Sequence, residues 1–215
     1  MNEPDNQNKS TTPQPHDVVR EPKGDSSKIR QRPSKFRFSM RTLFILVTLH
    51  CVVLVPLSMK LYQARQQRLA VAEIQKLGGR VHLNQTGTVN QVDLRNTKIT
   101  DAGLEHLKGL TSLTSLNLDG TQVTDAGLES LNGLTSLKGL SLHRTQITDA
   151  GLENLKDLTS LTYLDLRSTQ ITDAGLEHLK GLTNLYNIIL NDTKITDAGL
   201  SELKAALPRC NVSNS

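Results

Sequence analysis

Apolar residues recur between residues 90 and 212 in a pattern that changes its period within every 24 residues. In one unit, Leu116 and Leu118 alternate with polar residues, which predicts a short strand with one buried face. Leu128 and Leu131 then lie three residues apart, and Leu134 follows at the same spacing, which places them on one helical face. Each unit is therefore predicted to consist of a strand, a turn, a helix and a return segment.

A pentapeptide, Thr-Asp-Ala-Gly-Leu, marks every unit, and it occurs five times at intervals of 24 residues. A strict period of this length predicts a solenoid, in which each unit buries its apolar face by stacking on its neighbours. We expect Thr124 to be a helix N-cap, Asp125 to serve the N-terminus of that same helix, and Gly133 to end it. The five copies are Thr100–Leu104, Thr124–Leu128, Thr148–Leu152, Thr172–Leu176 and Thr196–Leu200.

The full repeat, L-x-x-L-x-L-x-x-T-x-[IV]-T-D-A-G-L-x-x-L, resembles the leucine-rich repeat family. The resemblance implies an α/β fold, a short horseshoe with parallel strands on the concave face and helices on the convex face. The variant is similar to the cysteine-containing subtype of F-box proteins and many bacterial proteins, with threonine at the usual cysteine position. We expect the hydroxyls of these threonines to satisfy buried backbone groups. They are Thr97, Thr121, Thr145, Thr169 and Thr193.

One apolar segment precedes the repeats. Thr42–Met59 has no formally charged residue, and as a helix it would be about 27 Å long, against about 30 Å for the hydrocarbon core of a bilayer. We predict a transmembrane helix over residues 42–61. A cleaved signal peptide is disfavoured, because no small-x-small site follows the apolar run closely. Six basic residues in 28–41 against three in 60–68 predict a cytoplasmic N-terminus and extracytoplasmic repeats.

Around this span, the chain is predicted to have four parts. Residues 1–41 form a disordered basic cytoplasmic tail, and 42–61 form the span. Residues 62–89 form a linker helix and N-terminal cap, which includes a strand at Arg80–Leu83. Residues 90–215 form the leucine-rich repeat domain, whose C-terminal cap includes a strand at Pro208–Val212. Phe-Ser-Met-Arg-Thr-Leu (Phe38–Leu43), one span and these repeats together resemble bacterial membrane-anchored leucine-rich repeat proteins.

The net charge argues against nucleic acid as a partner. The chain carries +4 overall, but residues 81–215 hold 11 basic and 15 acidic residues, so the repeat domain is acidic. Cys51 and Cys210 cannot form a disulfide framework, and the histidines and carboxylates lack the spacing of metal ligands. We therefore expect no catalytic residue, no metal, no cofactor and no enzymatic activity.

The strand residues that alternate with the buried ones would face the concave surface, where we expect a protein or peptide partner. Tyr163, Asp165 and Arg167 form the most credible patch, because tyrosine and arginine are enriched in interface hot spots. The sequence leaves the oligomeric state open. It also leaves an alternative function, an intracellular adaptor similar to F-box proteins or a regulator of the GTPase-activator or ribonuclease-inhibitor kind. The predicted partner-binding residues are Asp93, Arg95, Asn117, Asp119, Ser141, His143, Tyr163, Asp165, Arg167, Asn187 and Asn191.

Overall fold

The computed structural model describes residues 39–214. By its contacts the chain divides into two units, Met1–Leu43 and Phe44–Ser215. The predicted disordered tail, residues 1–41, lies outside the described residues except for its last three. Of these three, Met40 and Arg41 already belong to a helix.

This helix runs without interruption from Met40 to Lys76 and is long and apolar enough to cross a membrane. It consists of α1 (Met40–Leu49), a π-helical turn (His50–Leu54) and α2 (Val55–Lys76). The π turn precedes Pro56, which has no N–H to donate, and the N–H of Val55 bonds the carbonyl of His50 instead. The predicted boundary between span and linker at residues 61 and 62 therefore falls inside a continuous helix.

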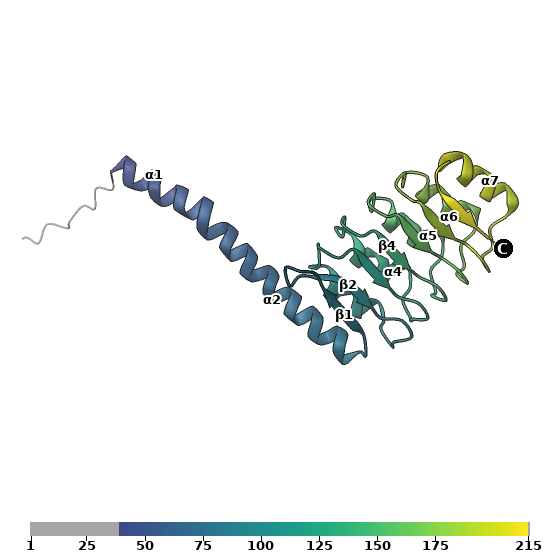
Figure 1. Ribbon diagram of the computed structural model, residues 1–215, viewed down its shortest axis with the longest axis horizontal. Coiled ribbons are helices and arrows are strands. Elements are labelled where there is room, and N and C mark those ends of the chain that lie inside the picture. The colour runs from purple at the N-terminus through teal and green to yellow at the C-terminus, as the bar shows by residue number, and fades with distance from the viewer. Residues whose placement is uncertain (1–38, 215) are drawn as a thin grey trace, which may run out of the picture. The chain divides into compact units, whose positions relative to one another are not determined.

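Seven strands form one sheet, in which their spatial order follows their order in the chain (Figure 1). The first strand pairs antiparallel with the second, and all later neighbours pair parallel. The predicted C-terminal strand begins three residues late, because Pro208 to Cys210 form a turn closed by the Cys210 N–H on the Leu207 carbonyl. The strands are β1 (Arg80–Leu83), β2 (Val89–Asp93), β3 (Ser115–Asn117), β4 (Gly139–Ser141), β5 (Tyr163–Asp165), β6 (Asn187–Ile189) and β7 (Asn211–Ser213).

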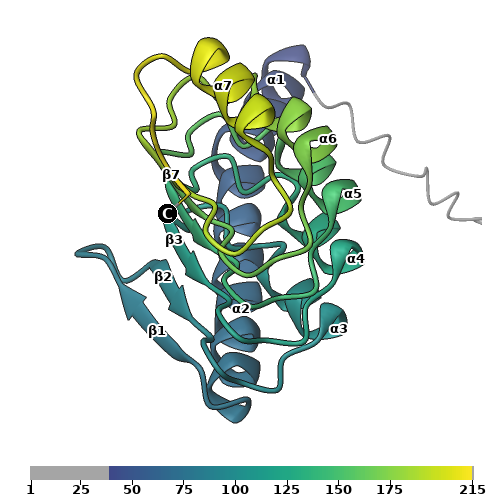
Figure 2. The same cartoon turned by 90° about the vertical axis from the view of Figure 1, so that its right-hand side faces the viewer.

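In the first four repeats, the pentapeptide begins a single α-helical turn at its aspartate and a 3-10 turn follows, whereas in the fifth repeat it begins a helix of 10 residues. The helices lie on the side opposite the sheet (Figure 2). The prediction that Leu134 extends the helical face is wrong, because the 3-10 turn ends before it, but Leu134 is still fully buried. The helices are α3 (Asp101–Leu104), α4 (Asp125–Leu128), α5 (Asp149–Leu152), α6 (Asp173–Leu176) and α7 (Asp197–Ala206). The 3-10 turns are Glu105–Leu107, Glu129–Leu131, Glu153–Leu155 and Glu177–Leu179.

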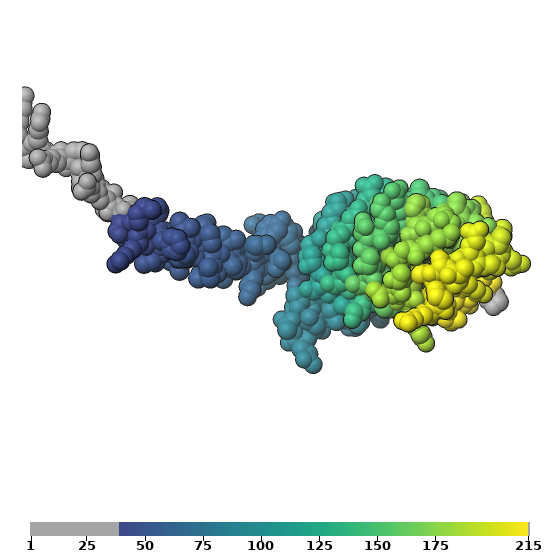
Figure 3. Space-filling model, turned by 90° about the horizontal axis from the view of Figure 1, so that it is seen from above, coloured from purple at the N-terminus to yellow at the C-terminus, as the bar shows by residue number. Residues whose placement is uncertain are grey.

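The core consists of aliphatic columns that run through all repeats. The successive repeats appear as bands of colour in Figure 3. Leu116, Leu140 and Leu164 of one column are each at most 1% exposed. On the N-terminal side, α2 inserts Ala70 and Ile74, which are 1% and 2% exposed. Because α2 supplies core side chains, it is part of the folded domain.

One turn residue after each strand adopts a left-handed conformation. These residues have positive φ at repeat-equivalent positions, and only the second is a glycine, with φ of 64°. In the first four of these residues the N–H donates to a carbonyl of the next repeat, as in the 2.7 Å bond from Asn96 N to Asp119 O. The parallel hydrogen-bond ladder therefore continues beyond the strands. The five residues are Asn96, Gly120, Arg144, Ser168 and Asp192.

The threonine ladder satisfies backbone groups as predicted. Each hydroxyl donates to the carbonyl three residues earlier in its own repeat, as from Thr121 to Leu118 and from Thr145 to Leu142, both at 2.6 Å. The same bond forms at Thr97, Thr169 and Thr193. The Leu118 carbonyl also accepts the Thr121 N–H at 3.2 Å, so the hydroxyl is the second and shorter hydrogen bond to this carbonyl.

The aspartates of the pentapeptide contradict the prediction that each serves its own helix. Asp125 accepts from the Thr148 N–H at 2.8 Å and from the Thr148 hydroxyl at 2.6 Å, so it bonds the next repeat. This bond was not predictable from the local pattern, because the two residues are 23 positions apart. We call each such pair an Asp–Thr bridge. The four bridges are Asp101–Thr124, Asp125–Thr148, Asp149–Thr172 and Asp173–Thr196.

The glycine of the pentapeptide leaves room for this bridge. A Cβ built at Gly151 would lie 2.3 Å from Asp125 Oδ1, and the equivalent contacts at Gly127, Gly175 and Gly199 are 2.1–2.4 Å. The repeated threonine, aspartate and glycine are therefore one device for joining adjacent repeats. The leucine that completes the pentapeptide packs into the core in the first four repeats.

Candidate functional site

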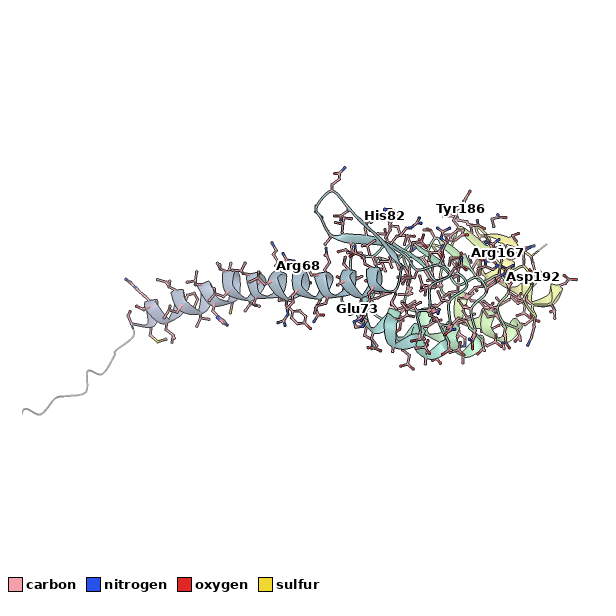
Figure 4. All side chains as sticks on the ribbon, turned by 90° about the horizontal axis from the view of Figure 1, so that it is seen from below. Arg68, Glu73, His82, Arg167, Tyr186 and Asp192 are labelled. Carbon is pink, nitrogen blue, oxygen red and sulfur yellow. The ribbon has the colours of Figure 1, made fainter. Side chains whose placement is uncertain are left out.

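The candidate site is the solvent side of the sheet, which we call the strand face. It comprises the outward side chains of β2–β6 and of the second residue after each strand. The strand register aligns Asp93 with Asn117, Ser141 with Asp165, and Gly139 with Tyr163, so the predicted columns exist. Figure 4 shows Arg167 and Tyr186 projecting on this side, away from the short helices.

At the β2 end of the strand face, Asp93 and Arg95 form an ion pair. The Arg95 Nε lies 3.0 Å from both carboxylate oxygens, and Nη2 lies 2.9 Å from Oδ2. The hydrogen bond from Arg95 lowers the pKa of Asp93 below its ordinary value, more than burial raises it. The pair therefore holds the Arg95 guanidinium against the sheet.

In the middle of the strand face, Asp119 organises the neighbouring repeat. It accepts the hydroxyl hydrogen of Ser141 and, at 3.2 Å, the backbone N–H of His143. Asn117 in turn accepts the Asp119 N–H at 2.9 Å. Serine, histidine and aspartate thus lie together, but the serine donates directly to the carboxylate. A nucleophile needs the histidine between them, so this geometry does not activate Ser141.

The third cluster, Tyr163, Asp165 and Arg167, brings together the three residues that the sequence singled out. The Asp165 side chain is only 1% exposed. Its oxygens accept from the Arg167 N–H at 3.1 Å, from Nε at 3.0 Å and from Nη2 at 2.6 Å. The Tyr163 hydroxyl approaches the same carboxylate at 3.5 Å. The expectation that Asp165 is a contact residue is therefore corrected: it is a buried anchor for Arg167.

Electrostatics explain why this anchor is stable. Burial raises the pKa of Asp165, but the hydrogen bonds and charge of Arg167 outweigh it and lower the pKa below the ordinary value. Burial, with the nearby carboxylate, raises the pKa of Tyr163, so its hydroxyl stays protonated. Since the Arg167 side chain remains 40% exposed, the cluster presents a fixed guanidinium beside a half-buried aromatic ring.

The remaining predicted residues divide by exposure. Ser141 is nearly buried at 9% and occupied by Asp119, so it too is a positioning residue. Asn187 is half-buried, and its Oδ1 is buried with no hydrogen-bond partner in the described part of the chain. Asn191 and His143 lie half-buried at the edge of the face.

Sequence reasoning missed Tyr186, which is 73% exposed immediately before β6. Its repeat-equivalent residues are Thr114, Lys138 and Thr162, so an aromatic residue interrupts a polar column. That substitution was the available signal. Tyr186 adds apolar area to the same end of the strand face as Tyr163, in the adjacent repeat.

Residues 39–214 contain no side-chain cluster typical of a metal site. No group of three or more histidine, cysteine, aspartate or glutamate side chains in that range could hold a metal ion. Cys51 and Cys210 are both free thiols.

Comparison with known proteins identifies the repeats. A family profile described as Leucine rich repeat matches residues 111–171. No curated protein matches the chain. Among solved structures, the ectodomain of the receptor kinase SOBIR1 from Arabidopsis thaliana is 17% identical with a TM-score of 0.47, over 70% of this chain and 91% of that one.

In two other comparisons, this chain spans less than two thirds of the length of the solved chain. An internalin of Listeria monocytogenes, inlF, is 17% identical with a TM-score of 0.44, over 68% of this chain and 62% of its own. The PEPR1–AtPEP1 complex gives 16% identity and a TM-score of 0.43, over 62% of this chain and 19% of that one.

Parallel strands joined through one-turn helices around leucine columns define a solenoid of the kind suited to protein–protein binding. The profile match lies inside these repeats, so residues 111–171 are identified as leucine-rich repeats, and the flanking units share their pattern.

Proposed function

We propose that this protein is anchored in a membrane by residues 42–61 and binds a protein or peptide partner on its strand face. The observation that carries the binding proposal is the Tyr163–Asp165–Arg167 cluster. A buried carboxylate fixes the guanidinium through Nε and Nη2, so Arg167 loses little side-chain entropy when a partner binds. The half-exposed ring beside it supplies contact area.

The chemistry of the cluster favours a partner that offers a hydrogen-bond acceptor next to an apolar group. A carbonyl or carboxylate oxygen would face the fixed guanidinium, and an aliphatic or aromatic side chain would pack on Tyr163 and Tyr186. The five strands of the strand face, β2–β6, extend about 25 Å at strand spacing, which suits a short peptide or a modest protein interface.

Photo-crosslinking tests the binding proposal. A photoreactive phenylalanine analogue replaces Tyr163 or Tyr186 in the full chain, and Lys156 on the helix side is the matched control. Adducts of one common mass from both tyrosine positions, absent at Lys156 and lost on Arg167→Ala, would support it. Adducts that form equally at Lys156, or that persist in Arg167→Ala, would refute it.

We further propose that the repeats lie outside the cytoplasmic membrane. The excess of basic residues before the apolar segment supports this orientation. Protease treatment of intact cells that express the chain with a C-terminal tag tests it. Loss of the tag is expected, whereas a tag protected until the membrane is ruptured would reverse the orientation and favour the adaptor or regulator alternative. A regulator that presents an arginine would also need to release Arg95 or Arg167 from its aspartate.

A further inference from the structure

An apolar pocket of about 570 Å³ lies between α2 and the turn that follows the first 3-10 segment. Two of its apolar walls, Met59 and Tyr62, are 58% and 64% exposed. On the opposite side, Gly109 approaches the helix so closely that a Cβ there would lie 3.4 Å from the Gln66 Cβ. The pocket residues used below are Ser58, Met59, Tyr62, Gln66, Gly109 and Thr111.

The helix wall of this pocket is continuous with the apolar segment. Ser58 and Met59 belong to its last turn, within residues 42–61. Gln66 lies five residues beyond residue 61, which is about 7.5 Å along a helix. The interfacial layer on each side of a bilayer is about 5–7 Å thick, since total thickness is about 40–45 Å and the hydrocarbon core about 30 Å. The pocket therefore begins at the hydrocarbon boundary and ends at the outer edge of the interface.

The first repeat is held at this level by packing. Ala70 and Ile74 of α2 are buried in the core of the domain, and the Gln67 side chain donates to the Gly87 carbonyl at 2.9 Å. Because these contacts follow the pocket within about two helical turns, the loop of Gly109 and Thr111 stays beside the end of the apolar segment.

We propose that this pocket binds a phospholipid of the surrounding bilayer. The upper acyl chain covers Met59 and Tyr62, and the lipid's glycerol and headgroup region lies against Gln66 and Thr111. An aromatic residue such as Tyr62 is favoured at this depth because its ring is apolar and its hydroxyl is polar. The first repeat is thereby a lipid-contacting element, and this inference rests on the membrane anchoring proposed above.

Tryptophan fluorescence tests the proposal, because the natural chain contains no tryptophan. Thr111→Trp places a single reporter at the pocket in the full chain, reconstituted in phosphatidylcholine nanodiscs whose acyl chains carry bromine near the headgroup end or, in a second preparation, near the methyl end. Thr159→Trp is the matched control, since it is exposed and repeat-equivalent but lies two repeats away. Val52→Trp reports on the span itself. Ser112→Trp replaces Thr111→Trp if circular dichroism shows that the latter is misfolded.

The expected result is that Thr111→Trp loses most of its fluorescence in lipid brominated near the headgroup end and Val52→Trp in lipid brominated near the methyl end, whereas Thr159→Trp keeps its fluorescence in both. If only Val52→Trp is quenched, the span is real but the lipid pocket is refuted. If Val52→Trp is also unquenched, the anchoring proposal fails and the lipid pocket fails with it. Protection of Thr111→Trp from aqueous acrylamide without quenching by brominated lipid would overturn the proposal in favour of a second copy of the chain.

Discussion

The Asp–Thr bridge predicts a strong coupling between two residues of adjacent repeats, Asp125 and Gly151. In Gly151→Ala, the new Cβ would meet the Asp125 carboxylate at 2.3 Å and Ile147 Cγ2 at 3.1 Å. The carboxylate must move, so its two hydrogen bonds to Thr148, at 2.8 and 2.6 Å, are broken or weakened.

The magnitude follows from these bonds. Hydrogen bonds to charged groups contribute about 1.5–3 kcal/mol each, and partial exposure of Asp125 reduces this to about 1 kcal/mol each. Alanine gains about 1 kcal/mol over glycine in a helix. We therefore expect Gly151→Ala to lower the free energy of unfolding by about 1 kcal/mol and Asp125→Ala by about 2 kcal/mol.

The double variant distinguishes this mechanism from a general intolerance of alanine. Without the carboxylate, the Cβ at position 151 no longer meets the Asp125 oxygens, and the higher helix propensity of alanine stabilises the helix. The double variant should therefore lower the free energy of unfolding by only about 1 kcal/mol. The loss is then about 2 kcal/mol smaller than the sum of the single losses.

Urea unfolding of the full chain in detergent micelles, followed by far-UV circular dichroism, measures these free energies. Gly181→Ala is the glycine control, because a Cβ there meets nothing within 4 Å. Asp197→Ala is the aspartate control: among residues 39–214 no side-chain hydrogen bond of Asp197 occurs, so it should cost about 0.5 kcal/mol through the helix dipole alone. Single losses that add to within about 0.5 kcal/mol would refute the bridge as the reason for the glycine.

Three further predictions concern the turns and the strand face. Arg144→Gly should raise the free energy of unfolding by up to about 1 kcal/mol, because φ there is 55°, whereas Gln146→Gly should lower it; thermal melts that rank them oppositely would contradict this. Thr145→Val should cost about 1 kcal/mol, because the Leu142 carbonyl loses the 2.6 Å bond from the hydroxyl and keeps only the 3.3 Å bond from the Thr145 N–H, measured by urea unfolding; a neutral effect would show that the hydroxyl is dispensable. Because Arg167 lowers the folded-state pKa of Asp165, stability from this pair is present above the unfolded pKa of about 3.9 and is lost as pH falls through the folded value. The stability difference between the natural chain and Arg167→Met should therefore shrink between pH 6 and pH 3, and a constant difference would show that the pair does not titrate as argued.

The repeat architecture was predictable because it depends on patterns within 24 residues. Leu116 and Leu118 indicated a strand by their alternation, and the structure has a strand at Ser115–Asn117, which contains Leu116 and ends just before Leu118. The Asp–Thr bridge was not predictable by the same means. Asp125 stands in the first turn of a helix, where a local electrostatic role is the usual explanation, and only the stacking of repeats brings Thr148 to it.

On the strand face, too, some features were predictable from the sequence and others were not. Alternation correctly indicated which side chains leave the core, but it could not rank them by exposure. Asp165 and Ser141 occupy outward positions yet are buried, because neighbouring polar side chains close over them. Tyr186 is the reverse case, since it precedes its strand and lay outside the columns that the pattern defined.

The constancy of the pentapeptide and the variability of the strand face have one physical origin. In a solenoid each interior position touches its equivalents on both sides, so a change at the pentapeptide alters two interfaces at once, as Gly151 and Asp125 illustrate. Strand-face positions contact their neighbours mainly through side chains that lie on the surface, and a change there disturbs at most a local bond such as that between Ser141 and Asp119, not a bridge between every pair of repeats. Differences between repeats therefore accumulate on the strand face, and a cluster such as Tyr163–Asp165–Arg167, which forms within one repeat, can arise without disturbing the stack. The same freedom explains why the repeat pattern specifies the scaffold but carries no information about the partner proposed for that cluster.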